Sequence, residues 1–112
     1  MKLTPEEKQI VRAFCDFIYE VPVGSTFTLL NLQGALRFVN PGIPTRQRYS
    51  QYLRIATEDR WIEPLADSPQ DTYRRRIKAA NETCQRSAYM RGELQILKDK
   101  IIRTLDGIVW LD

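Results

Sequence analysis

The chain has 112 residues and a net charge of +3, and its 43% hydrophobic and 28% charged content lies near the averages for globular domains. This size suits one domain with a single hydrophobic core, and the composition excludes a disordered or fibrous chain. The longest apolar runs fall far short of the roughly 20 residues that span a bilayer, and residues 1–20 are too charged for a secretion signal. We therefore expect a cytoplasmic protein without membrane contact.

Residue types that support catalysis are scarce. The chain has no histidine, which removes the most common general base and the most common metal ligand. Its two cysteines, Cys15 and Cys84, are too far apart for a C-x-x-C zinc motif, and neither a nucleophile elbow nor a glycine-rich phosphate loop is present. We therefore expect no enzyme activity, no metal and no cofactor.

A helix is predicted from the first residues onward. Thr4 can cap it, Pro5 suits its first turn, and Glu7 stands at the third helical position, from which its side chain can reach back to the Thr4 amide. Apolar residues then follow at helical spacing on one face: Ile10, Val11, Phe14, Phe17 and Ile18. This is a core helix, and it should end before Pro22 and Gly24.

A short strand and a second helix are predicted next. Residues 25–28 are rich in strand-forming types, and Thr28 can also cap the helix that follows. Apolar residues at three-to-four spacing indicate a helix over 29–39. The proline- and glycine-containing turn at 40–44 ends that helix.

A third helix, 46–59, has one apolar face and one polar face, and Thr45 can cap it. The apolar stripe consists of Tyr49, Tyr52, Leu53 and Ala56. The polar face carries side chains that hydrogen-bond to phosphates and to base edges: Arg46, Gln47, Ser50, Gln51, Arg54 and Thr57. Arginine suits guanine and glutamine suits adenine. An ordinary solvated helix surface explains this face equally well when the helix is considered alone.

A two-stranded hairpin is predicted after the third helix. Residues 61–65 read as one short strand, 66–71 have turn chemistry, and 72–77 read as the returning strand. Pro64 cannot donate a backbone hydrogen bond, so its strand should lie at an edge or end there.

The hairpin contains three consecutive arginines. Alternation along a strand sends Arg74 and Arg76 to one face and Arg75 to the other, so Arg74 and Arg76 are the candidate phosphate contacts. The alternative is that these charges only protect an exposed strand edge from aggregation.

The excess positive charge lies in the third helix and the hairpin. Residues 46–78 hold 8 Lys or Arg and 5 Asp or Glu, whereas the two types balance in residues 1–45 and 79–112. A basic surface confined to one unit is what polyanion binding requires, because phosphate neutralisation supplies the sequence-independent part of nucleic-acid affinity.

The order helix, short strand, helix, turn, helix, hairpin resembles the winged helix-turn-helix family of DNA-binding proteins over residues 4–77. Three local patterns carry the resemblance: Gly-Ser-Thr-Phe-Thr at 24–28, Arg-Trp-Ile-Glu-Pro at 60–64 and Tyr-Arg-Arg-Arg-Ile at 73–77.

The resemblance implies a role for each part. It places residues 46–57 in the major groove and the hairpin residues 66–76 along the DNA backbone or minor groove. The turn at 40–44 is longer than the usual connection of this family, which leaves the angle between the two helices open.

The last predicted helix begins at Ser87, after a polar connector over 78–86. Its apolar positions form one narrow stripe: Met90, Leu94, Leu97, Ile101 and Leu105. Such a stripe either folds back onto the first helix of the same chain or pairs with its copy in a second chain. We favour the homodimer, since the stripe lies after a unit that is already complete.

The predicted fold is mainly α with a small β-hairpin wing, a winged helix-turn-helix domain at 1–78, followed by a connector and a C-terminal dimerisation helix at 79–112. The expected function is sequence-specific binding of double-stranded DNA, as a small transcriptional regulator. The alternative is a protein-interaction module, an adaptor or inhibitor that docks on a nucleoprotein complex without binding free DNA.

Overall fold

The computed structural model describes residues 3–37, 46–66, 71–76 and 88–111, and for 46–47, 88–90 and 107–111 it describes only the course of the backbone. Within these ranges the chain forms helices and a small antiparallel sheet, which confirms the mainly helical class with a small β element. The helices are α1 (Pro5–Glu20), α2 (Leu29–Leu36), α3 (Arg46–Glu58) and α4 (Ala88–Leu111). The strands are β1 (Thr26–Thr28), β2 (Ile62–Pro64) and β3 (Thr72–Arg75).

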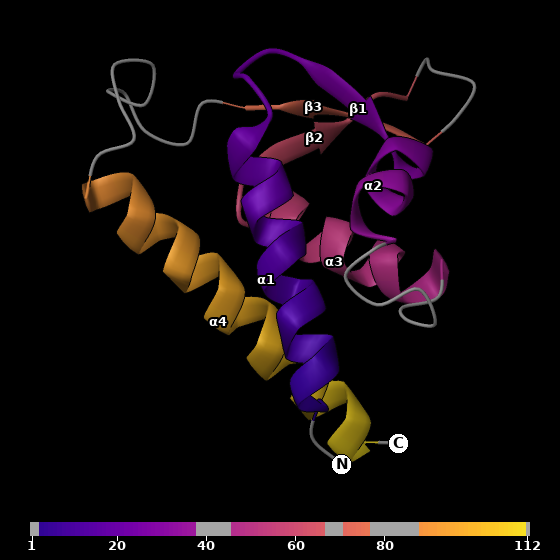
Figure 1. The fold of residues 1–112 in the computed structure, drawn as a ribbon, viewed down its shortest axis with the longest axis vertical. Helices are drawn as coiled ribbons and strands as arrows, with labels where there is room; N and C mark the ends of the chain where they lie inside the picture. The colour runs from indigo at the N-terminus through magenta and orange to yellow at the C-terminus, as the bar shows by residue number, and fades with distance from the viewer. Residues whose placement is uncertain (1–2, 38–45, 67–70, 77–87, 112) are drawn as a thin grey trace.

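The sheet has three strands in the order β1-β3-β2, so the predicted hairpin is extended by the short strand that precedes α2 (Figure 1). Both pairings are antiparallel, with Phe27 opposite Tyr73 and Glu63 opposite Arg74. Phe27 explains why β1 joins the sheet, because its ring lies 5.4 Å from the Phe17 ring and 5.8 Å from the Tyr73 ring. Burial of this aromatic side chain therefore holds β1 against α1 and β3.

The predicted caps of α1 and α2 are present, with one correction. The Thr28 hydroxyl oxygen accepts a hydrogen bond from the Asn31 amide, and the Asn31 side-chain oxygen accepts one from the Thr28 amide, which completes a capping box at α2. Thr4 accepts from the Glu7 amide at 3.1 Å. The Glu7 side chain, however, points toward α3 instead of the Thr4 amide, because buried partners on α3 are available to it. The predicted cap at Thr45 lies outside the described residues.

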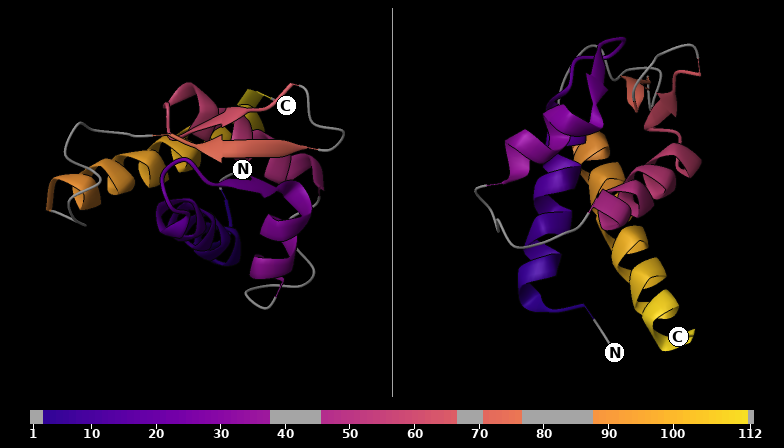
Figure 2. Two further views of the ribbon diagram at one scale, coloured as in Figure 1. Left: turned by 90° about the horizontal axis from the view of Figure 1, so that it is seen from above. Right: turned by 90° about the vertical axis from the view of Figure 1, so that its right-hand side faces the viewer.

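One hydrophobic core joins all the described elements, and α1 is its central helix. Residues of α1 that are fully buried include Ile10, Val11, Phe14, Cys15 and Ile18. Trp61 and Ile62, at the start of β2, and the α4 stripe belong to the same cluster. Two views of the ribbon show α4 running beside α1 with α3 across them (Figure 2).

The predicted dimer stripe is part of this core. Leu94 is 7% exposed, and Leu97, Ile101 and Leu105 are fully buried, within a single chain. They pack against α1 and α3, which cover the stripe and leave it inaccessible to a second chain. The interpretation of these residues as a homodimer interface is therefore wrong, and the intramolecular alternative holds. The Met90 side chain lies outside the described residues.

Polar contacts fix α4 at several points along its length. Lys98 pairs with Asp16 of α1 at 3.3 Å, and Lys100 pairs with Asp59, at the end of α3, at the same distance. Asp106 accepts a hydrogen bond of 2.7 Å from the backbone amide of Leu3. The apolar stripe alone would allow α4 to shift along its axis relative to α1 and α3, and these polar contacts fix its position.

Arg60 ends α3 in a left-handed conformation, with φ of 66°. The Arg60 amide donates to the Thr57 carbonyl and the Trp61 amide donates to the Ala56 carbonyl, each at 3.0 Å. These two bonds form the Schellman arrangement, in which this position usually holds glycine. The reversal places Trp61 in the core and directs the chain into β2.

Arg60→Gly is expected to raise the free energy of unfolding by about 0.5–1 kcal/mol, because glycine adopts positive φ without a Cβ clash. Gly24, which also has a positive φ of 88°, allows the opposite replacement, of glycine by alanine, as a control. A Cβ added at Gly24 meets no atom within 4 Å, so Gly24→Ala should lose stability through its backbone alone. Urea denaturation followed by circular dichroism measures both, and a less stable Arg60→Gly protein would contradict the assignment.

Candidate nucleic-acid interface

Helix α3 separates its side chains into an inner face and a narrow outer face. The buried residues are Tyr49, Tyr52, Leu53, Ile55 and Ala56. Ser50 and Arg54 are exposed and Gln51 is half-buried, so these three predicted contact residues share the outer face. Ile55 is buried although it lies outside the predicted stripe, and its burial narrows the outer face. The side chains of Arg46 and Gln47 lie outside the described part of the chain.

Arg54 and Thr57, on the outer side of α3, already have partners. Arg54 Nε lies 3.7 Å from Glu58 Oε1, and the two side chains are 66% and 63% exposed. Such an exposed i,i+4 pair stabilises a helix only slightly, so Arg54 can exchange Glu58 for another anion at little cost. The Thr57 hydroxyl donates to the Leu53 carbonyl at 2.8 Å, which occupies its only hydrogen.

The three hairpin arginines divide between the two faces of the sheet, as alternation predicts. Arg74 and Arg76 are exposed, whereas Arg75 is 2% exposed. Glu63 of β2 lies close to both exposed arginines, 3.4 Å from Arg74 and 3.7 Å from Arg76. Among the described residues of the hairpin, its outer face therefore carries two cations and one shared anion, a net positive charge.

Arg75 has a structural role beneath the sheet. Its Nε donates to the Ile18 carbonyl at 2.9 Å, and its guanidinium also donates to the Arg76 carbonyl. The guanidinium carbon lies 4.8 Å from the centre of the Trp61 ring, a cation–π distance. Ile18 belongs to the last turn of α1, where the helix dipole favours a cation. Arg75 therefore joins the sheet to α1 and is not available to phosphate.

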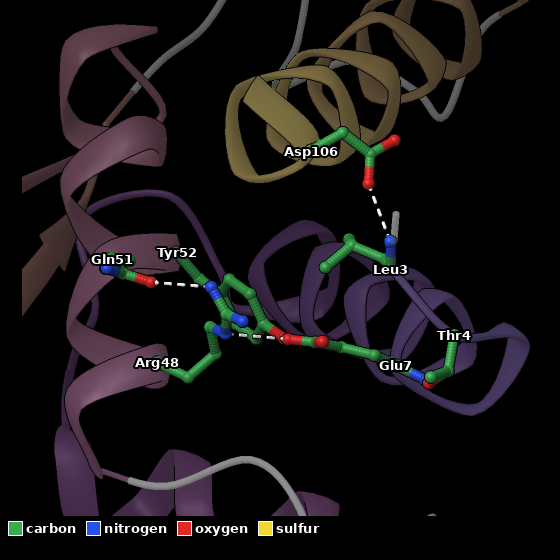
Figure 3. A network of polar contacts seen from close by, with 7 residues as sticks. All are labelled: Leu3, Thr4, Glu7, Arg48, Gln51, Tyr52 and Asp106. Atoms are coloured by element: carbon green, nitrogen blue, oxygen red, sulfur yellow. Dashed lines mark hydrogen bonds and ion pairs between the residues drawn. The ribbon is translucent and has the colours of Figure 1, made fainter. Parts of the chain in front are cut away.

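A buried polar network connects α1 to the outer face of α3 (Figure 3). The Tyr52 hydroxyl donates to Glu7 Oε2 at 3.1 Å, and Arg48 Nε lies 2.8 Å from the same oxygen. Arg48 also donates through its NH1 group to Gln51 Oε1 at 3.1 Å. Burial raises the pKa of Tyr52, and the Glu7 carboxylate raises it further, so the phenol keeps its proton and acts as a donor.

Sequence reasoning missed both Arg48 and the inward position of Glu7. Glu7 precedes Ile10 and Val11 by three and four residues, which places it on the apolar stripe of α1. A carboxylate on a buried stripe needs a cationic or hydrogen-bond-donating partner. The position of Glu7 on the stripe could therefore have predicted that a buried partner exists. Which residue supplies the partner depends on how α3 crosses α1, and the sequence does not specify that crossing.

The described residues offer little support for catalytic chemistry. Burial raises the pKa of the Cys15 thiol, so it stays protonated and unreactive at neutral pH. No group of three or more metal-ligating side chains occurs among the described residues. A shallow hollow between α4 and the end of α3 is lined by Ile96, Asp99, Arg103, Thr104 and the Lys100–Asp59 pair.

The arrangement suits binding by surface contact. An outer strip on α3 with hydrogen-bonding side chains lies beside a hairpin with a net positive face, and α3 contacts β2 directly. No helix in the described part of the chain has the length and apolarity needed to cross a membrane. Comparisons with protein-family models, with curated proteins and with solved structures returned no match.

Proposed function

We propose that this protein binds double-stranded DNA as a winged helix-turn-helix domain and acts as a small transcriptional regulator. Helix α3 enters the major groove, and the β2–β3 hairpin contacts the DNA backbone. The element order and the strand order β1-β3-β2 support this arrangement. The observation that carries the proposal is that Ser50, Gln51 and Arg54 line the outer face of α3, next to a hairpin bearing Arg74 and Arg76.

The described charges on the outer face of α3 and on the hairpin favour an anionic partner. The described outer side chains include Arg54, Arg74 and Arg76, against Glu58 and Glu63. Exposed ion pairs contribute at most about 1 kcal/mol, so a phosphate can replace either glutamate as the arginine partner. Because α4 is packed within its own chain, the proposed DNA binding does not depend on a dimer formed through that helix.

The test compares two charge-matched double variants. Replacing Arg74 and Arg76 with alanine should weaken binding to all duplexes equally, and the slope of log affinity against log salt should fall by about two, one per lost phosphate contact. The control replaces Arg12 of α1 and Arg91 of α4, which are exposed elsewhere, and should leave the slope nearly unchanged. Fluorescence anisotropy with labelled duplexes measures both. Equal effects of the two double variants would reject the hairpin as the contact surface.

A third variant tests whether Arg54 contacts the bases or the phosphates. Arg54→Ala should cost about 1–3 kcal/mol on a preferred duplex and much less on random duplexes, since base contacts carry sequence preference. An equal loss on both kinds of duplex would assign Arg54 to the phosphates instead.

The alternation of glutamates with arginines also favours a second candidate, docking on a protein of mixed or acidic surface charge. Mixed charge at a contact surface gives specificity for one protein partner. In that case the purified protein shows no duplex binding at near-physiological salt, while charge reversal at Glu63 abolishes capture of its protein partner.

A further inference from the structure

The side-chain amide of Gln51 is held in one orientation by Arg48. Arg48 NH1 donates to Gln51 Oε1 at 3.1 Å, and these two residues are three positions apart on α3. A guanidinium group has donors only, so the amide oxygen, and not the amide nitrogen, must face it. Figure 3 shows the Gln51 nitrogen pointing away from Arg48.

Arg48 is itself fixed by the core of the protein. Its Nε lies 2.8 Å from Glu7 Oε2, and the side chain of Glu7 is only 10% exposed. Tyr52, which is fully buried, donates to the same carboxylate oxygen. If this half-buried arginine rotated away, the buried carboxylate would keep the Tyr52 hydrogen bond but lose its cationic partner, which is costly. The orientation of Gln51 is therefore built into the packing of α1 against α3.

This orientation changes what Gln51 can read in a major groove. A glutamine pairs with adenine through two bonds, in which its oxygen accepts from adenine N6 and its nitrogen donates to adenine N7. With its oxygen turned toward Arg48, Gln51 presents the two hydrogens of its amide nitrogen. These fit the two neighbouring acceptors of guanine, O6 and N7, or O4 of thymine. Adenine offers them only N7, and its neighbouring N6 amino group would meet another donor.

We propose that Gln51 acts as a donor-only reader that selects guanine or thymine over adenine, and that Arg48 is the positioning residue that imposes this choice. The proposal deepens the DNA-binding function and rests on it. It reverses the adenine preference that the residue type alone suggests for Gln51.

The experiment begins with selection of preferred duplexes from a random library by the wild-type protein and by Gln51→Ala. The base position at which only Gln51→Ala loses its preference is the position that Gln51 reads. At that position the wild-type protein should favour guanine or thymine over adenine by about tenfold, within the range of a specific base contact. Adenine at that position would overturn the proposal, and so would a Gln51→Ala profile identical to that of the wild type.

Two further variants test the mechanism. Lysine offers donors only, so Gln51→Lys should keep the wild-type base preference. If the preference instead changed from adenine to guanine, Gln51 in the wild-type protein would be reading adenine, and the proposal would be wrong. Arg48→Met releases the Gln51 oxygen and should move the preference toward adenine by about tenfold. The double variant with Glu7→Gln removes the carboxylate charge that Arg48→Met leaves unpaired, and circular dichroism establishes that it is folded. An unchanged preference in the folded double variant would overturn the role of Arg48.

The outcomes distinguish this inference from the function on which it rests. Absence of binding to every duplex would overturn both. Selective binding that depends on Arg54, Arg74 and Arg76 but reads adenine through Gln51 would retain the DNA-binding function and overturn only the donor-only reading.

Discussion

Arg75→Ala is expected to lower the free energy of unfolding by about 3–5 kcal/mol, because it leaves a large cavity and removes donors from buried carbonyls. Arg75 is 2% exposed, donates to the Ile18 carbonyl and lies over the Trp61 ring. Urea denaturation followed by tryptophan fluorescence and circular dichroism measures the loss, and the fluorescence also reports the change beside Trp61.

The matched control is the neighbouring arginine on the other face of β3. Arg74 is exposed, and its pairing with Glu63 at 3.4 Å is a surface contact. Arg74→Ala should therefore change the free energy of unfolding by less than about 1 kcal/mol. If Arg74→Ala and Arg75→Ala were equally destabilising, the assignment of a structural role to Arg75 alone would be wrong.

Ile101→Ala should lower the free energy of unfolding by about 2–5 kcal/mol, since Ile101 is fully buried between helices of its own chain. Ile96 provides a control of the same residue type on the same helix, because its side chain is 55% exposed. Ile96→Ala should change stability by less than about 1 kcal/mol, as surface replacements usually do. Chemical denaturation of both variants gives the comparison.

The dependence on protein concentration adds a second test to the Ile101 prediction. In an intramolecular core the midpoint of unfolding is independent of concentration, whereas for a dimer seam it rises with concentration. A midpoint for the wild-type protein that rises over a hundredfold concentration range would return the α4 stripe to a dimer interface.

Local features of this fold were predictable from the sequence. The capping residues Thr4 and Thr28, the edge position of Pro64 and the opposite faces of Arg74 and Arg75 follow from rules that involve only neighbouring residues. Each of these features is set within a few positions along the chain, and for that reason the structure agrees with each one.

The features that were missed depend on contacts between distant segments. An apolar stripe such as that of α4 reads the same whether its partner is α1 or a second chain, so periodicity cannot decide between them. Glu7 can satisfy a cap or a buried arginine, and the choice is made by the approach of Arg48, 41 positions later. The orientation of Gln51 depends on the same contacts, because Arg48, which pairs with Glu7, also donates to the Gln51 amide oxygen. Residue type alone suggested that Gln51 reads adenine.

The central position of β3 in the sheet determines which changes in the length of the hairpin the three arginines tolerate. A slip of one residue in β3 would turn Arg74 and Arg76 inward and Arg75 outward, exchanging a core residue for two surface ones. The strand is aligned against β1 as well as β2, so its register does not depend on the length of the segment that joins β2 to β3. Insertions and deletions in that segment should therefore leave Arg74 and Arg76 on the outer face and Arg75 in the core, because pairing with β1 alone holds the register of β3.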